Sequence, residues 1–191
     1  MPLPEPAPIV APRVTLRAVT ADDLPELLLI NGDDTVTHHL PYDSWRSLDD
    51  GQAWLQRMQA LQATGAAQQR VIQRQADGRV IGTLLLFRHD EPSARLEIGY
   101  VIGRAQWRQG YAREAVAAAC THAFGSLGVR RIEAEVNPDN EASAGLLRGL
   151  GFVLEGRLRQ RWTAKGRTYD TLLFGCLADE WQAPPAPRPR A

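Results

Sequence analysis

The stretch from residue 94 to residue 137 restricts the possible folds most, because it predicts a strand, a helix and a second strand in close succession. "ARLEIGYVI" (94–102) and "RRIEAEVN" (130–137) have the patterns of strands, and residues 109–127 form an alanine-rich amphipathic pattern. Two neighbouring strands joined through one helix are parallel, and the crossover is right-handed. The chain is therefore expected to contain a βαβ unit.

Further segments extend this unit into a sheet with helices on its faces. Strands are predicted over 13–19, 68–75, 79–89, 152–158 and 167–177, and helices over 20–30, 47–65 and 140–151. This order favours an α+β (mixed α/β) domain with a mixed sheet of about seven strands and about four flanking helices.

Proline and alanine dominate both ends of the chain. "MPLPEPAPIVAP" (1–12) and residues 182–191 are predicted to be disordered tails, because such segments neither pair nor pack easily. Residues 13–181 are then expected to form a single domain.

The charge balance excludes some classes of partner. Lys+Arg and Asp+Glu each number 22, so the net charge is zero at pH 7, which argues against a nucleic-acid partner. A signal peptide and a membrane-spanning apolar run are not apparent, so a cytoplasmic location without a membrane partner is expected. Cys120 and Cys176 are expected to be small core residues rather than a disulfide or metal pair.

The strand at 94–102 carries a carboxylate beside a glycine. Alternation places Glu97, Gly99 and Val101 on one face. A carboxylate on a central strand is costly unless a polar partner faces it, so Glu97 is a candidate functional residue. Gly99 is a candidate for a bulge that frees backbone groups for a ligand. The alternative is an edge strand on which Glu97 faces solvent.

The loop "GRAQWRQGYAR" (103–113) predicts an anion site at the start of the following helix. Arg104, Arg108 and Arg113 flank Gly110, and a helix N-terminus presents unpaired N–H groups and a positive dipole end. The stretch matches neither the dinucleotide-binding nor the Walker pattern, so it predicts a phosphate-binding turn of another type. An ordinary loop with solvated arginines is the alternative.

Three stretches together resemble the GNAT superfamily of acyl-CoA-dependent N-acetyltransferases. They are "EIGYVIGRAQWRQGYAREAV" (97–116), "VNPDNEASAGLLRGLGFVLEGRLR" (136–159) and the closing strand followed by "LADEW" (177–181). With "TLRAVTADDLPELL" (15–28), the resemblance covers residues 13–181 and is closest to the branch of ribosomal-protein alanine N-acetyltransferases (RimJ/RimL-like). It implies acetyl-CoA as co-substrate, no metal, and a mostly antiparallel mixed sheet with one splayed pair of strands.

The family's pyrophosphate loop is similar to residues 107–112 of this chain. The resemblance implies that backbone N–H groups of residues 108–113 hold the CoA pyrophosphate, and it assigns cofactor contacts to Arg108, Gln109, Gly110, Tyr111, Ala112 and Arg113. Two positions depart from the pattern: Trp107 stands first, as is common in this branch, and Arg108 replaces the usual glycine. Arg108 is expected either to reach a CoA phosphate or to restrict the loop backbone.

The pantetheine arm of CoA is expected, by the same resemblance, between the splayed strands. Backbone groups of Tyr100, Val101 and Ile102 would bind it, Asn140 would hydrogen-bond it, and Ser143 would approach the thiol sulfur. Asn140 and Ser143 are also good helix-capping residues, which is the structural alternative. Many family members carry a tyrosine acid in this helix; the aligned position here is Leu147, so Ser143 or water is expected to act instead.

The expected reaction is direct attack of a primary amine on acetyl-CoA, with Glu97 as general base and a backbone N–H around Val101 stabilising the oxyanion. The acceptor is either a protein N-terminal α-amine or a small-molecule amine. A catalytically inactive CoA-binding sensor or interaction module is the alternative function, and the last strand makes a homodimer conceivable. His38 and His39 are expected to line the acceptor pocket or to lie in a solvated loop. The basic, aromatic "RLRQRW" (157–162) is expected to form a solvated hairpin, and guidance of an acidic or nucleic-acid-bound acceptor is the alternative.

Overall fold

The computed structural model describes residues 2–185. The strands are β1 (Ile9–Val10), β2 (Val14–Ala18), β3 (Ala67–Arg74), β4 (Val80–Asp90), β5 (Arg95–Ile102), β6 (Arg131–Val136), β7 (Val153–Ala164) and β8 (Arg167–Leu177). The α-helices are α1 (Leu24–Asn31), α2 (Asp34–Thr37), α3 (Leu48–Ala63), α4 (Tyr111–Gly125) and α5 (Glu141–Gly149).

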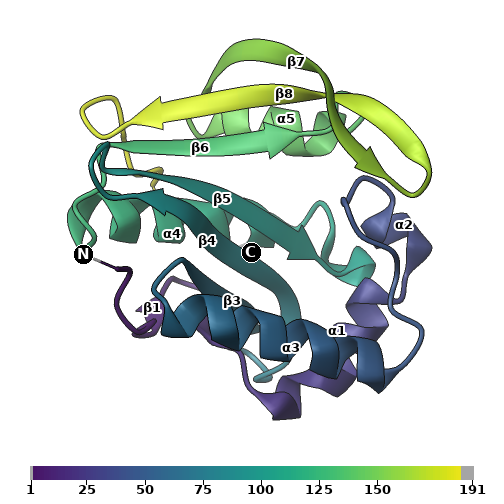
Figure 1. Cartoon of the computed structure of the whole chain (residues 1–191). Coiled ribbons are helices and arrows are strands. Elements are labelled where there is room, and N and C mark those ends of the chain that lie inside the picture. The colour runs from purple at the N-terminus through teal and green to yellow at the C-terminus, as the bar shows by residue number, and fades with distance from the viewer. Residues whose placement is uncertain (1, 186–191) are drawn as a thin grey trace.

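One eight-stranded sheet runs through the molecule in the order β1-β2-β3-β4-β5-β6-β8-β7 (Figure 1). Every neighbouring pair is antiparallel except β5 and β6, which are parallel and are joined through α4. The predicted βαβ unit and the mixed, mostly antiparallel sheet are thus confirmed. Relative to the expected seven strands and four helices, the structure adds the two-residue β1 and the four-residue α2.

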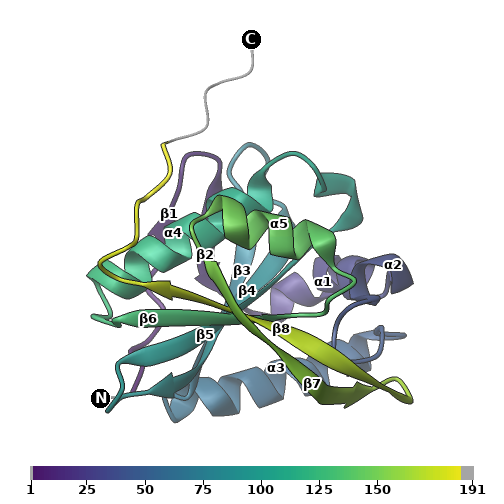
Figure 2. The same ribbon diagram turned by 90° about the horizontal axis from the view of Figure 1, so that it is seen from above.

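Helices cover both faces of the sheet (Figure 2). On one face, α4 and α5 pack on a large apolar core that includes Leu84, Ile98, Ala119 and Leu147. On the other face, α1 and α3 enclose a smaller cluster around Leu27 and Leu55, among others. The spacing of apolar residues along each helix therefore determines which side of the helix packs against the sheet.

The parallel pair β5–β6 is short. Its register runs only from Arg95 opposite Arg131 to Glu97 opposite Glu133, after which the two strands no longer pair. The splayed pair that the family resemblance implied is therefore present, and it leaves the carboxyl-terminal half of β5 with one edge unpaired.

The described part of the N-terminal segment, residues 2–12, is ordered, in contrast to the predicted disordered tail. Pro4 and Ala7 accept hydrogen bonds through their carbonyls from Gln68 at 2.7 Å and from the fully buried Arg70 at 2.6 Å. Proline lacks the N–H but keeps the carbonyl, so a proline-rich segment can still satisfy buried donors of a strand. Residues 182–185 have no regular structure, and the rest of the predicted C-terminal tail lies outside the described residues.

Cys120 and Cys176 are both buried, as expected for small core residues. Within residues 2–185, no helix combines the length and the apolar character that a membrane span would need.

Candidate active site

The loop before α4 presents free backbone donors. Gly110 adopts a φ of 82° and is the N-cap of α4, and Arg108 adopts a φ of 61°. Among the described residues, no acceptor pairs with the backbone N–H groups of residues 108–113. Six unpaired N–H groups at a helix N-terminus suit an anionic ligand such as a pyrophosphate.

Arg13 holds this loop in place. Its backbone N–H and Nε donate to the two carboxylate oxygens of Glu114 at 2.6 and 2.7 Å, and its Nη1 donates to the carbonyl of Gln109 at 3.1 Å. The guanidinium also lies 4.6 Å from the ring centroid of Tyr111. Sequence reasoning missed this support, since Arg13 precedes the loop by about a hundred residues and only the fold brings them together.

Trp107 fixes the other end of the loop to β5. Its indole N–H donates to the carbonyl of Ile102 at 2.8 Å. This bond gives a physical reason for a tryptophan at the first loop position. It also uses one of the backbone acceptors that was expected to bind pantetheine.

The free backbone donors of β5 can be identified from the sheet pattern. Gly103 donates its N–H to the carbonyl of Ile81 at 2.9 Å. Hydrogen-bonded pairs alternate in an antiparallel ladder, so the N–H of Val101 also points toward β4, and the N–H groups of Tyr100 and Ile102 point to the splayed side. Of the backbone N–H groups around Val101, those of Tyr100 and Ile102 are therefore the ones open to a ligand in the splay.

A groove of about 1030 Å³ runs from this loop to the N-terminus of α5. It is lined by ten of the residues predicted for the donor site: Tyr100, Val101, Ile102, Arg108, Gly110, Tyr111, Ala112, Arg113, Asn140 and Ser143. Gln109 is the exception, because its side chain donates to the carbonyl of Ala105 at 2.7 Å. We call this space the donor groove.

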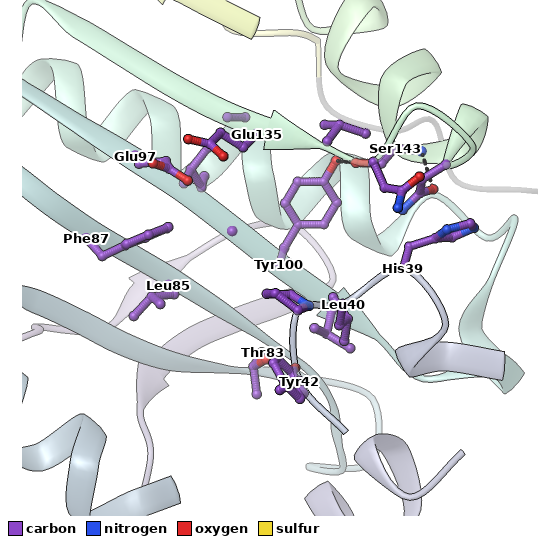
Figure 3. A pocket seen from close by; sticks show the side chains of 18 of the residues that line it. His39, Leu40, Tyr42, Thr83, Leu85, Phe87, Glu97, Tyr100, Glu135 and Ser143 are labelled. Atoms are coloured by element: carbon purple, nitrogen blue, oxygen red, sulfur yellow. Dashed lines mark hydrogen bonds between the residues drawn. The ribbon is translucent and has the colours of Figure 1, made fainter. Parts of the chain in front are cut away.

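A tyrosine hydroxyl reaches α5 from β5 (Figure 3). The hydroxyls of Tyr100 and Ser143 lie 2.8 Å apart, and burial raises the pKa of Tyr100 to about 12. Asn140 caps α5 by accepting a hydrogen bond from the backbone N–H of Ser143 at 3.1 Å. Capping is therefore a real role of Asn140, while the hydroxyl of Ser143 is left for Tyr100 and a ligand.

A second space, the acceptor cavity, has a volume of about 330 Å³ and lies beside the donor groove. The two spaces share six lining residues: His39, Leu40, Tyr100, Val101, Asn140 and Ser143. They therefore meet at the Tyr100–Ser143 pair, where the strands β5 and β6 have separated.

Glu97 lies in the wall of the acceptor cavity and is only 7% exposed, which excludes the solvent-facing alternative. Its Oε2 accepts a hydrogen bond from Arg88 at 2.7 Å, and its Oε1 has no hydrogen-bond partner among the described residues. Burial raises the pKa of Glu97, and the charge of Arg88 offsets part of this rise. A buried carboxylate with one free oxygen suits a general base.

The expected bulge lies on the neighbouring strand rather than at Gly99. The β4–β5 register is regular through Gly99 and shifts between Phe87 and Asp90. Arg88 sits in this irregularity with a φ of 51°, and it reaches both Glu97 and Glu135, the latter at 3.1 Å.

Glu135 of β6 faces Glu97, but both of its carboxylate oxygens already accept hydrogen bonds. It accepts hydrogen bonds from Arg161 at 3.0 Å and from the indole of Trp162 at 2.6 Å. Although burial alone would raise the pKa of Glu135, these bonds and the nearby arginines hold it below the usual value. The stretch 157–162 lies in the β7–β8 hairpin and is largely exposed, as the solvated alternative predicts, and Trp162 is its one residue that lines the cavity among those that the structure describes.

His39 lines both spaces, whereas His38 lines only the donor groove. Burial and the neighbouring His38 lower the pKa of His39, so it is neutral at pH 7. No group of three or more metal-binding side chains occurs in the part of the chain that the structure describes.

Comparison with known proteins decides the family. The family profile described as "Acetyltransferase (GNAT) domain" matches residues 13–153. The chain belongs to the GNAT acetyltransferase family. The GNAT fold and the donor groove agree with this assignment, and the chain is an acetyl-CoA-dependent acetyltransferase.

Individual relatives support the same conclusion. The chain is 35% identical to the uncharacterized N-acetyltransferase p20 of Bacillus licheniformis, over 88% of this chain and 95% of that protein. The structure of Mycobacterium smegmatis RimJ in complex with CoA-disulfide is 26% identical, with a TM-score of 0.80 over 91% of this chain and 87% of that one. This match supports the RimJ/RimL-like branch of the GNAT family.

A further structure shows the shared fold. The spermidine N-acetyltransferase of Vibrio cholerae, solved with CoA and spermine, is 21% identical, with a TM-score of 0.77. The alignment covers 88% of this chain and 97% of that one.

Arg108→Gly tests the residue that replaces the usual glycine of the family in the loop before α4. Arg108 has no hydrogen bond or ion pair within the described residues to offset its left-handed φ, which costs about 1–2 kcal/mol. We expect the glycine variant to melt about 2–4 °C higher per kcal/mol regained. We also expect it to bind acetyl-CoA several-fold more weakly, because the exposed guanidinium is free to meet a phosphate.

Thermal unfolding and a binding titration measure the two effects, and Arg108→Asn is the matched control. Asparagine tolerates this backbone region but carries no charge. An unchanged acetyl-CoA affinity in both variants would contradict a phosphate contact by Arg108.

Proposed function

We propose that this GNAT enzyme transfers the acetyl group of acetyl-CoA directly to a primary amine, either a protein N-terminal α-amine or a small-molecule amine. One observation carries the proposal: the donor groove and the acceptor cavity share the walls formed by Tyr100, Asn140 and Ser143. Two substrates bound in these spaces would have their reacting groups adjacent. Holding them together supplies most of the acceleration in a two-substrate reaction.

Glu97 acts as the base in this proposal. Acetyl-CoA supplies the thioester that the amine attacks, and the amine must first lose a proton. An α-amino group has a pKa of about 7.7–8.0 and is partly neutral at pH 7, whereas a lysine-like amine at about 10.4 needs more help. The free Oε1 of Glu97 takes this proton directly or through one water.

The Tyr100–Ser143 pair acts on the leaving group, which is the thiol sulfur of CoA. Its hydroxyls lie where the donor groove meets the acceptor cavity, and the raised pKa keeps Tyr100 protonated at pH 7. The pair therefore holds a proton for the departing sulfur, while the N–H of Tyr100 or Ile102 stabilises the oxyanion. Tyr100 supplies from a strand the hydroxyl that Leu147 cannot supply from the helix.

The proposal is tested by thermal unfolding with acetyl-CoA, with dephospho-CoA and NAD as controls. A ligand at 100 times its Kd stabilises by about 2.7 kcal/mol. We expect a clear shift with acetyl-CoA, a smaller one with dephospho-CoA, none with NAD, and CoA release once an amine is added. A shift without CoA release in the presence of a broad set of amines would contradict the enzymatic proposal.

Neither cysteine is expected to carry an acetyl group. Both thiols are buried, and burial raises the pKa of Cys176 to about 11 and that of Cys120 likewise above its usual value. We expect an aromatic disulfide reagent to leave the native enzyme unlabelled and active, and to label both thiols after denaturation. Labelling of the native chain with loss of activity would contradict direct transfer.

A further inference from the structure

The wall of the acceptor cavity is largely apolar and aromatic. Besides the Tyr100–Ser143 junction and Glu97, the cavity is lined by Leu40, Tyr42, Trp54, Leu85, Phe87 and Tyr169, among others. At about 330 Å³, the cavity is at the small end of the range of ligand pockets, about 300–1,000 Å³. Such a wall stabilises a compact apolar group and leaves additional charges unsolvated.

Among the described residues that line this wall, only one carboxylate oxygen is free to pair with an ammonium group. Both oxygens of Glu135 are hydrogen-bonded, and one oxygen of Glu97 is bound to Arg88, which leaves Glu97 Oε1. Arg57 also lines the cavity and has no carboxylate partner among the described residues. The two glutamates are thus paired with Arg88 and Arg161, and Arg57 adds a further cation to the cavity wall.

This charge balance disfavours a polyamine. A second or third ammonium group would find no free carboxylate in the cavity, and it would be repelled by the cation of Arg57. Asp34 and Asp139 line the donor groove and not the acceptor cavity. A single amine nitrogen at Glu97 Oε1 satisfies the one carboxylate oxygen that is free among the described residues of the wall.

Gly99 leaves room on the cavity wall beside this position. It lies between Glu97 and Val101 on the same face of β5 and lines the acceptor cavity. A Cβ built at Gly99 would have Phe87 Cε1 at 3.6 Å as its nearest neighbour, which is ordinary contact, and its φ is not in the left-handed region. The backbone therefore tolerates a side chain, and glycine here leaves space for a ligand.

From these observations we infer that the acceptor is a small primary monoamine with an uncharged apolar body of about one aromatic ring, which lies over Gly99 against Phe87. This inference rests on the proposed acetyl transfer and names the acceptor class of the same site. Gly99 is then a specificity-determining residue, since it sets the size of the body that fits.

The experiment compares kcat/KM for three acceptors at saturating acetyl-CoA: 2-phenylethylamine, spermidine and an alanine-initiated peptide. CoA release gives the rate, and mass spectrometry confirms the acetylated product. We expect 2-phenylethylamine to exceed both others by at least about tenfold, the scale of one misfitted group in a pocket. Preference for spermidine or for the peptide would overturn the inference and leave the proposed function standing.

Gly99→Ala supplies the second arm, with Gly125→Ala as the matched control. Gly125 is exposed at the end of α4 and has no atom within 4 Å of a built Cβ. We expect Gly99→Ala to lower kcat/KM for 2-phenylethylamine about tenfold. The same variant should change the value for methylamine little, and the control should change neither. An equal loss for both amines, in a variant that acetyl-CoA still stabilises, would overturn the role of Gly99.

Binding separates this inference from the proposed function. Thermal stabilisation of the CoA-saturated chain by each amine is measured without turnover. Stabilisation by 2-phenylethylamine without acetylation would contradict the proposed function, and it would support the fit of this amine to the cavity without making it an acceptor. Neither binding nor acetylation of this amine would overturn the acceptor class.

Discussion

Glu97→Gln is expected to lower kcat by about 10²–10⁴-fold while leaving the affinity for acetyl-CoA unchanged. Glutamine keeps the shape of the side chain and can still meet Arg88, but it cannot accept a proton from the amine. Glu97 lines the acceptor cavity and not the donor groove, so the two effects separate. Initial rates and a binding titration on the same preparation give both quantities.

The pH profile distinguishes a base from a merely structural carboxylate. Burial raises the pKa of Glu97, so activity should fall as the pH drops through this raised value, where the base becomes protonated. In Glu97→Gln this inflection should disappear, and only the ionisation of the amine should remain. The acid Asp22 is exposed, and Asp22→Asn is a suitable control that should change nothing. An unaltered profile in the glutamine variant would show that Glu97 is not the base.

The same shift predicts an effect on stability. A carboxyl whose pKa is higher in the folded than in the unfolded chain costs stability once the pH exceeds its unfolded pKa. Glu97→Gln should therefore not lower the melting temperature at pH 7, despite the altered contact with Arg88. A loss of activity in a variant that melts no lower is the signature of a functional residue.

The second large effect is expected at the Tyr100–Ser143 pair. Tyr100→Phe and Ser143→Ala should each lower kcat by about 100-fold, because each removes one hydroxyl from the 2.8 Å hydrogen bond. The double variant should lose little more than either single variant, since both remove the same unit. A double-mutant cycle on kcat measures this coupling.

Both substitutions preserve the local structure. Asn140 accepts its hydrogen bond from the backbone N–H of Ser143, so the cap of α5 remains in Ser143→Ala. The phenyl ring in Tyr100→Phe fills the same volume. If the losses in kcat of the two single variants were fully additive, a shared role in protonating the sulfur would be contradicted. If only the affinity for acetyl-CoA changed, the pair would be a binding contact and not a catalytic one.

The parts of the fold that follow from local patterns were predictable. The βαβ unit over 94–137 and the capped helix that begins after Ser47 depend on periodicity and end signals in short windows. Gly110 also indicated a turn before α4, and the structure shows that this glycine adopts a left-handed conformation. Such features depend on residues that are close together in the sequence.

The parts that depend on distant contacts were not predictable. The hydroxyls of Tyr100 and Ser143 are separated by 43 positions in sequence, and no local pattern signals their contact. The ordered N-terminal segment depends on the buried donors of Gln68 and Arg70, which lie in the strand predicted over 68–75. The position of Arg88 follows from an irregular register that its own sequence does not mark.

The central claim is that one site brings an acetyl donor and an amine acceptor together for direct transfer. Initial rates of CoA release, measured while acetyl-CoA and the amine are both varied, test it most directly. We predict lines that intersect in the double-reciprocal plot, as a ternary complex requires, with CoA release that depends on the amine. Parallel lines would indicate an acetylated enzyme, and release independent of the amine would indicate simple hydrolysis; either result would contradict the account.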